Sequence, residues 1–362
     1  SELSALIPGA HVSGTDKDVV TLKANSADIK AGDAFIALKG SITDGHNFID
    51  NALKAGAGVI ICNHEGCNAP PGATLIEVSD TGKALKVLLP ALFPHATGLS
   101  LIGITGTNGK TTTTYLLESV LKDSGMNPGV MGTINMRYAD VTIPSAITTP
   151  GPVESFERLE NMSAAGIDCC IMEVSSHALD QDRLIGLSFD YAIFTNLSQD
   201  HLDYHMDMDT YFLAKKKLFE DYLDGPAVIN IDDPYGKELA KGLKTPVTYG
   251  MDHRAMIHTS SLEHTPSGLA IDLSTPKGSV SISSSLLGDI NVYNIMAAVG
   301  LSQAMGIKTR SVISGIGSLK SVPGRMEIVE NAYGLKIIVD YAHTPAALET
   351  ALASAKGFTK GR

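Results

Sequence analysis

The segment at residues 103–111 has the residue types and spacing that bind a phosphate group. It reads Gly-Ile-Thr-Gly-Thr-Asn-Gly-Lys-Thr, after a short apolar run and before apolar residues at helical spacing. Glycines let backbone N–H groups point inward, a helix N-terminus carries partial positive charge, and Lys110 adds a full charge. Ile104 stands where the strict nucleotide-binding pattern has glycine. A turn with incidental glycines does not explain Gly-Lys-Thr, so we predict a nucleotide phosphate site.

Two other apolar runs end in polar residues. Residues 168–173 end in Glu173, and residues 190–195 lead into a loop that contains His201. Ligands collect beyond the carboxyl ends of strands in an open parallel sheet, where the phosphate loop also lies. A carboxylate at that edge can hold Mg²⁺ on nucleotide phosphates. Glu173 and His201 are therefore candidate metal ligands.

The predicted helix at 209–223 places a lysine on its apolar face. Lys215 lies in the middle of that face, whereas Lys216 is at its margin and Lys217 on the far side. Burial disfavours an ammonium ion and lowers its pKa, so a partly neutral amine could be modified or act in catalysis. The alternative is an apolar stem with its amine in water.

A later predicted helix carries two asparagines three residues apart. Asn291 and Asn294 follow Gly288 and can direct both amides toward one partner. An asparagine amide can pair with an adenine edge, although helix capping is an alternative for either residue.

We expect an α/β protein of three domains. Residues 1–97 form a small α/β domain, with strands at 34–38, 58–62 and 74–78 and helices at 47–55 and 81–92. Residues 98–322 form a central, doubly wound, mostly parallel P-loop domain, with an antiparallel hairpin at 268–283. Residues 323–362 are too few to form an independent α/β domain. They look like the first βα unit of a third, Rossmann-like domain.

The composition excludes several classes of protein. The formal charge of −11 gives no indication of a basic surface that would bind nucleic acid. No apolar run in the sequence is long enough to span a membrane. No signal-like N-terminus is present, so we expect a soluble, cytoplasmic protein. Cys62 and Cys67 lack a second ligand pair at zinc-site spacing, and we expect reduced thiols, with Cys169 and Cys170 in the core.

Together these segments resemble the Mur ligase family, the ATP-dependent amide ligases of peptidoglycan precursor synthesis. The resemblance is nearest to its MurE branch, which adds the third amino acid to UDP-N-acetylmuramoyl-L-alanyl-D-glutamate. The motifs that carry it are Gly103–Thr111, Glu173–His177, Asn196–Asp203, Tyr211–Lys215, Gly288–Asn294, Asp340–His343, Thr148–Pro150, Ser175–Arg183 and Asn25–Ser26.

The resemblance implies a role for each matching residue. Lys110, Lys215, His201 and Glu173 would be catalytic, with Thr111 and Glu173 on one Mg²⁺ and His201 and a CO₂-derived carbamate on Lys215 at a second. The implied ATP-binding residues are Gly106, Thr107, Asn108, Gly109, Lys110, Thr111, Thr112, Asn291, Asn294, Arg325 and Asp340. Those implied for the UDP-muramoyl dipeptide are Asn25, Ser26, Ser41, His46, Thr148, Thr149, Ser176, Gln181 and Arg183.

The implied reaction has two steps. The D-glutamate side-chain carboxylate attacks the γ-phosphate of ATP to give an acyl phosphate, and the amine of a diamino acid then displaces phosphate. Diaminopimelate is the default amino acid, from the breadth of the family, and L-lysine is the alternative. In this family the residues that choose between the two lie in the C-terminal domain. The resemblance also implies a monomer that serves cell-wall synthesis, and hence cell shape and division.

Other functions remain open from sequence alone. One is another ligase of the superfamily, of a different Mur type or of the folylpolyglutamate type. A second is a truncated module that binds nucleotide and UDP-muramoyl peptide without turnover. A third is a P-loop kinase or GTPase, against which the departure at Ile104 argues.

Overall fold

The computed structural model describes residues 2–40, 43–63, 74–265, 267–333, 335 and 337–357. Contacts within the chain divide it into two compact units. Unit 1 contains Ser1–Leu99, Pro150–Ala164 and Asp180–Leu187, and unit 2 contains the remainder. The chain therefore passes between the units several times.

Unit 1 is built on a five-stranded sheet. Its strands, in spatial order, are β1 (His11–Ser13), β5 (Thr74–Val78), β4 (Val59–Asn63), β3 (Ala34–Ile36) and β2 (Leu22–Lys23). Neighbours are parallel except β1 and β5. The helices are α1 (Glu2–Leu6), α2 (Ile49–Ala55), α3 (Thr81–Leu92) and α5 (Pro152–Ala164), with short 3₁₀ turns at Ser26–Asp28, Gly45–Phe48 and Ala96–Gly98. The strands and helices predicted before residue 97 are present, with ends shifted by at most two residues.

The cysteines show one error of prediction. Cys169 and Cys170 are free and fully buried, as expected of small core residues, and burial raises the pKa of Cys169 to about 12. Cys62 is disulfide-bonded, so the expectation of reduced thiols is wrong for that residue. Cys67, which was considered together with Cys62 above, lies outside the described residues.

Unit 2 is built on an eight-stranded sheet. In spatial order its strands are β13 (Val247–Tyr249), β12 (Ala227–Asn230), β11 (Tyr191–Phe194), β6 (Ser100–Thr105), β10 (Cys169–Glu173), β7 (Pro128–Met131), β8 (Asn135–Tyr138) and β9 (Val141–Pro144). Only β8 and β9 run antiparallel to their neighbours. Because β6 lies between β10 and β11, the loops after these three strands emerge at one edge of the sheet, as predicted.

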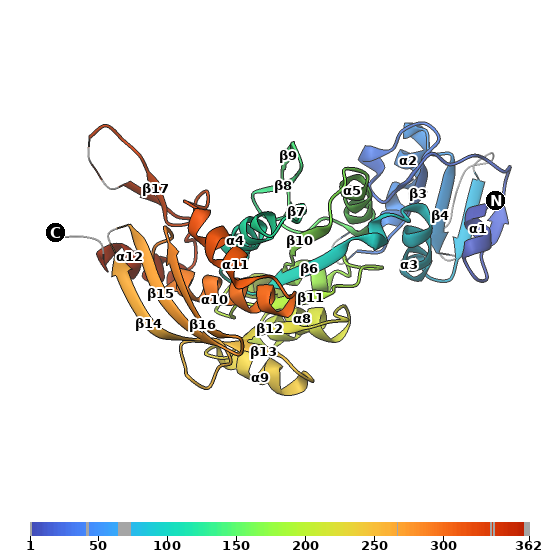
Figure 1. Ribbon diagram of the computed structural model, residues 1–362. Helices are drawn as coiled ribbons and strands as arrows, with labels where there is room; N and C mark the ends of the chain where they lie inside the picture. Colours follow the sequence, from blue (N-terminus) through green and yellow to red (C-terminus); the bar gives the residue numbers. More distant parts are fainter. Residues whose placement is uncertain are drawn as a thin grey trace. The chain divides into compact units, whose positions relative to one another are not determined.

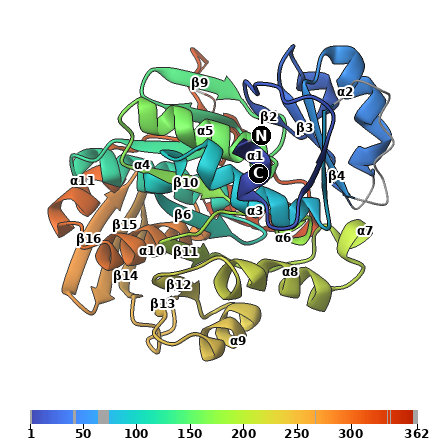
Figure 2. The same cartoon turned by 90° about the vertical axis from the view of Figure 1, so that its right-hand side faces the viewer.

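Helices and a second sheet complete the core of unit 2. The helices are α4 (Lys110–Asp123), α6 (Ser176–Asp180), α7 (Leu202–His205), α8 (Met208–Glu220), α9 (Pro234–Gly242), α10 (Asp289–Ala304), α11 (Thr309–Ser318) and α12 (Pro345–Gly357). Helix α11 packs against α4 and β16 (Figure 1, Figure 2). Helix α10 is buried on nearly all sides, since Val292, Ile295, Met296 and Val299 are each at most 1% exposed.

The antiparallel hairpin predicted at 268–283 is part of a three-stranded sheet. Its strands are β14 (His258–Thr265), β15 (Gly268–Thr275) and β16 (Gly278–Ser284). Near the C-terminus, β17 (Glu327–Val329) pairs antiparallel with β18 (Ile337–Val339) before α12. Within the described residues, no helix combines the length and apolar character that crossing a membrane requires.

Candidate active site

The loop between β6 and α4 is held tightly against the end of β11. The Asn108 N–H donates to Asn196 Oδ1 at 2.9 Å, and Thr195 Oγ1 donates to the Asn108 carbonyl at 2.6 Å. Gly106 has φ +143°, and a Cβ there would lie 1.9 Å from Thr195 Oγ1. Only glycine fits such a close approach in this conformation. The loop is therefore braced by the neighbouring strand before any ligand binds.

Two lysines converge on one carbonyl of this loop. Lys110 Nζ donates to the Gly106 carbonyl at 2.8 Å and to the Thr107 carbonyl at 3.0 Å. Lys215 Nζ donates to the same Gly106 carbonyl at 3.0 Å. Burial lowers the pKa of both amines, and the nearby Lys110 charge lowers that of Lys215 further. Lys215 is 1% exposed, so the prediction that it lies inside the apolar face of α8 is confirmed.

Glu173 ends β10 next to the start of α4. Its carboxylate accepts hydrogen bonds from Thr111 Oγ1 at 3.0 Å and Thr133 Oγ1 at 2.9 Å, and from the Thr133 N–H at 3.1 Å. The side chain is 1% exposed. A buried carboxylate beside two hydroxyl groups offers the all-oxygen donor set that Mg²⁺ prefers. The residues present therefore fit a magnesium ion bound by Thr111 and Glu173.

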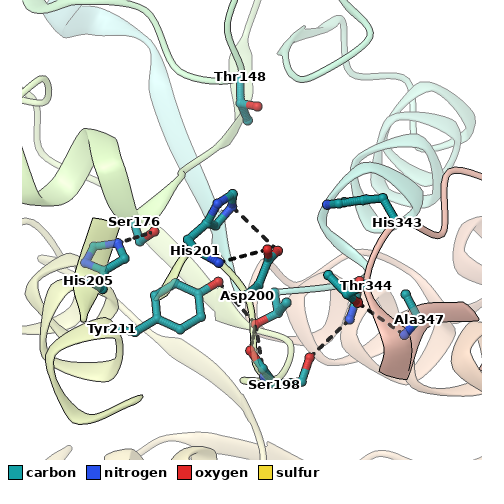
Figure 3. A network of polar contacts seen from close by, with 12 residues as sticks. Thr148, Ser176, Ser198, Asp200, His201, His205, Tyr211, His343, Thr344 and Ala347 are labelled. Carbon is teal, nitrogen blue, oxygen red and sulfur yellow. Dashed lines mark hydrogen bonds and ion pairs between the residues drawn. The ribbon is translucent and has the colours of Figure 1, made fainter. Parts of the chain in front are cut away.

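His201 occupies the loop after β11 in a left-handed conformation, with φ +53° and ψ +27°. Its N–H donates to Asp200 Oδ1 at 2.9 Å, and its Nε2 lies 3.6 Å from Asp200 Oδ2 (Figure 3). Partial burial lowers the pKa of His201, and the Asp200 charge opposes that change. A neutral imidazole is the form that binds metal ions. Across residues 2–40, 43–63, 74–265, 267–333 and 337–357, no group of three or more His, Cys, Asp or Glu is placed to hold a metal ion by protein ligands alone.

A small pocket in unit 2 collects the residues expected at adenine. It is lined by Asn108, Gly109 and Thr112 with Asn291, Asn294, Arg325 and Asp340, among others. The amide of Asn294 donates to Asn291 Oδ1 at 2.9 Å, and the amide of Asn291 donates to the Leu287 carbonyl at 2.7 Å. Each asparagine therefore has one amide N–H committed within the helix. Arg325 donates to Thr111 Oγ1 at 3.3 Å, and Asp340 accepts the Met326 N–H at 2.8 Å.

A cavity of about 1610 Å³ in unit 1 gathers four other sequence candidates. Asn25 and Ser26 line it together with Gln181 and Arg183, although about 155 residues separate the two pairs in sequence. His46 is not among its lining residues. Instead its Nε2 accepts the Asn63 N–H at 3.0 Å and its Nδ1 lies 2.6 Å from Asp44 Oδ1, so the ring supports the chain locally. Ser41 lies outside the described residues.

The remaining candidates lie in unit 2 around the end of β10. Thr148 Oγ1 is 3.1 Å from Thr133 Oγ1. Thr149 Oγ1 donates to the Glu173 carbonyl at 2.8 Å and accepts the Ser175 N–H at 3.0 Å. Ser176 is 1% exposed, so its hydroxyl faces the interior. Thr148 therefore lies next to a residue that binds the Glu173 carboxylate, and Thr149 contacts the Glu173 backbone.

Sequence reasoning missed several residues of the site. Thr133 binds Glu173 directly, and Asp200 is the carboxylate nearest to His201. Tyr211 was expected only as an apolar residue, yet Lys215 Nζ lies 4.6 Å from its ring centre. Asp200 precedes His201 in a polar loop, which was a usable signal. Thr133 carried no signal, because its contact with Glu173 joins distant segments, whereas Tyr211 lies one helical turn before Lys215, a spacing that was a usable signal.

Three family models match the chain. They are described as "Mur ligase family, catalytic domain" over residues 18–91, "Mur ligase middle domain" over residues 104–302, and "Mur ligase, glutamate ligase domain" over residues 324–362. The middle-domain match contains the phosphate loop, Glu173, His201 and Lys215.

Curated relatives match almost the whole chain. A UDP-N-acetylmuramoyl-L-alanyl-D-glutamate–2,6-diaminopimelate ligase of Geobacter metallireducens is 40% identical over 95% of this chain and 69% of its own length. The enzyme of the same name from Geobacillus kaustophilus is 38% identical over 98% of this chain and 74% of its own.

Solved structures share the fold. A ligase of the same name aligns with a TM-score of 0.77 and 29% identity, over 93% of this chain and 70% of that one. MurF ligase from Thermotoga maritima, solved with ADP, aligns with a TM-score of 0.67 and 21% identity over 92% and 74% of the two chains, which shows a common fold.

Proposed function

The chain belongs to the Mur ligase family, and we propose that it is the ligase that joins meso-diaminopimelate to UDP-N-acetylmuramoyl-L-alanyl-D-glutamate. Members of the Mur ligase family use ATP. Over nearly the whole of its length, this chain is similar to relatives that are named for the diaminopimelate ligase reaction. The single observation that carries the proposal is the convergence of Lys110, Lys215 and Glu173 on the phosphate loop. In the first step an anionic carboxylate attacks the anionic triphosphate of ATP, and groups that stabilise this charge are needed at the phosphate loop.

The residues around the loop divide the work of the first step. The loop N–H groups and Lys110 bind the phosphates, while Asn291, Asn294, Arg325 and Asp340 enclose the adenosine. Mg²⁺ held by Thr111 and Glu173 would supply positive charge that offsets repulsion between the attacking carboxylate and the triphosphate. We propose a second Mg²⁺ bound through His201 and a carbamate on Lys215. The depressed pKa of Lys215 supports this, because only a neutral amine reacts with CO₂.

The substrate residues fall into two groups. Asn25 and Ser26 would bind the uridine end in the unit 1 cavity, together with Ser41 and His46, of which His46 acts by supporting the chain. Gln181 and Arg183 would bind the anionic muramoyl dipeptide in that cavity, whereas Thr148, Thr149 and Ser176 would act near the reacting D-glutamate. The support is that Asn25, Ser26, Gln181 and Arg183 share one cavity, that Thr148 contacts Thr133 beside Glu173, and that Thr149 bonds the Glu173 carbonyl.

We also propose the domain limits 1–97, 98–322 and 323–362, which agree closely with the spans of the three matching family models. The protein would act as a monomer in the cytoplasm, where ATP is available, and contribute to cell-wall synthesis, cell shape and division.

The test is an ADP-release assay with UDP-N-acetylmuramoyl-L-alanyl-D-glutamate and meso-diaminopimelate. We expect ADP formation that requires both substrates and that L-lysine does not support. A matched acceptor, UDP-N-acetylmuramoyl-L-alanine, lacks the reacting carboxylate and should give none. Binding of dipeptide and ATP without turnover would indicate a non-catalytic module instead, and activity with a folate acceptor would contradict the proposal.

A further inference from the structure

A row of buried polar side chains connects the end of β10 with the phosphate loop. It runs from Ser176 in α6 through His205 in α7 and Tyr211 in α8 to Thr107. Figure 3 shows the first three of these side chains. Exposed fractions are 1%, 2%, 1% and 8% in that order. None of the roles assigned above uses His205. His205 is buried and hydrogen-bonded between two parts of the site, as buried polar groups generally are.

His205 has a defined contact on each side. Its Nε2 shares a hydrogen bond of 2.9 Å with Ser176 Oγ. Its ring stacks on Tyr211, with centroids 5.1 Å apart and an angle of 29° between the planes. The stacking fixes the plane of the imidazole, and the hydrogen bond fixes the hydroxyl at its edge. The histidine thereby transmits the position of α8 to the start of α6.

The hydrogen bonds at Thr107 determine how Tyr211 is held. The Thr107 hydroxyl donates to the Ser198 carbonyl at 3.2 Å and accepts the Ser198 N–H at 3.0 Å. A hydroxyl has one proton and two acceptor positions. The Tyr211 hydroxyl lies 3.2 Å from Thr107 Oγ1, and either oxygen can donate the hydrogen bond between them. The contact ties the tip of Tyr211 to the phosphate loop.

The two ends of the row depend on it to different degrees. The phosphate loop is also fixed by Asn196, Thr195 and both lysines. In the turn after β10, Thr149 Oγ1 accepts the Ser175 N–H, whereas His205 is hydrogen-bonded to the hydroxyl of the next residue, Ser176. Loss of His205 should consequently release the Ser176 hydroxyl and leave the nucleotide loop in place.

We propose that His205 is a positioning residue for the acceptor substrate, which holds Ser176 and the turn after β10 in the conformation that binds the D-glutamate end of the dipeptide. This inference rests on the proposed function, because it assigns the turn after β10 to that substrate. A preorganised turn avoids the entropy cost of ordering it on binding, so its loss appears in affinity for the dipeptide.

The experiment measures binding of UDP-N-acetylmuramoyl-L-alanyl-D-glutamate and of ADP by isothermal titration calorimetry. His205→Phe keeps the stacked ring and removes Nε2, whereas His205→Gln places an amide nitrogen near the same point. Ser176→Ala removes the other partner. His253→Phe is the matched control, since that side chain is 88% exposed. Thermal melts confirm that each variant is folded at the temperature of the titration.

We expect His205→Phe and Ser176→Ala each to weaken dipeptide binding about tenfold, with ADP affinity unchanged. The double variant should be no weaker than either single one, because both remove the same interaction. His205→Gln should recover most of the affinity, and His253→Phe should match the wild type.

Equal losses for dipeptide and ADP, or additive losses in the double variant, would mean that His205 is merely structural. Unchanged dipeptide binding in His205→Phe, with a wild type that binds, would overturn the positioning role alone. A wild-type chain that binds ADP and no dipeptide would overturn the proposed function together with this inference.

Discussion

At the scale of single residues, the least ordinary feature is that two amines share the Gly106 carbonyl. Burial and the nearby Lys110 charge both disfavour the ammonium form of Lys215, the more deeply enclosed of the two, and so lower its pKa. This arrangement costs stability and is retained next to the phosphate loop, as expected of a functional group. Two predictions follow from its burial and its charge.

The first concerns activity. Lys215→Ala should lower ligase turnover at least a hundredfold while ATP affinity stays within about threefold, since the loop N–H groups and Lys110 remain. Lys216→Ala is the control, because that lysine is on the same helix and forms an ion pair with Glu220 rather than a contact with the phosphate loop. Turnover is measured by ADP release and affinity by calorimetry. Full activity of Lys215→Ala without an added short carboxylic acid would contradict the role.

The second concerns pH. The folded-state pKa of Lys215 is lowered, so between that pKa and the ordinary value of about 10.4 the unfolded chain binds the additional proton. The free energy of unfolding should therefore rise with pH in that window. Lys215→Met has no amine to bury and should be more stable than the wild type at pH 7, by about 1 kcal/mol or more in the free energy of unfolding. Urea denaturation should show that the difference in free energy of unfolding between Lys215→Met and the wild type is smaller at pH 9 than at pH 7. An equal difference at both pH values would contradict a lowered pKa of Lys215.

At the scale of elements, the decisive contact is between the phosphate loop and the end of β11. These segments are about 90 residues apart in sequence and meet because β6 and β11 are parallel neighbours. The left-handed Gly106 allows the close approach. The loop conformation is thus imposed by the sheet as well as by its own glycines.

Gly106→Ala should therefore damage both stability and nucleotide binding. The added Cβ meets Thr195 Oγ1, so we expect a cost of about 3 kcal/mol and loss of measurable ADP binding. Gly125→Ala is the matched control, since Gly125 also has positive φ and has open space around it. That variant should cost about 1 kcal/mol and bind ADP normally. Equal effects in the two variants, measured by denaturation and calorimetry, would show that backbone strain alone matters.

At the scale of the whole molecule, unit 1 is discontinuous in sequence. Helix α5 and residues 180–187 belong to it and supply part of the wall of its cavity. The cavity proposed to bind the nucleotide sugar is therefore built partly from segments that follow β9 and α6 in sequence.

A fragment of residues 1–99 should accordingly bind the UDP-muramoyl dipeptide at least tenfold more weakly than the full chain. It retains Asn25 and Ser26 and loses Gln181 and Arg183. Calorimetry gives the affinities, and circular dichroism shows whether the fragment folds. Equal binding by a folded fragment would place the binding determinants within the first 99 residues.

The sequence by itself determined much of this protein. Local periodicity placed β10 and α8 within three residues of their observed bounds and indicated β6, α4 and α10, because apolar spacing and glycine position depend on neighbours along the chain. It also identified the buried position of Lys215 from the apolar face around it. The meeting of Lys110, Glu173 and His201 at one edge followed from parallel strand order.

Only the tertiary structure decided which partners those residues have. The shared Gly106 carbonyl, the bonds from Thr133 to Glu173 and the stacking of His205 on Tyr211 join segments that are remote in sequence. The assignment of α5 to unit 1 and the local role of His46 arise in the same way. Such contacts depend on how elements pack in three dimensions, and a one-dimensional pattern carries no record of that packing.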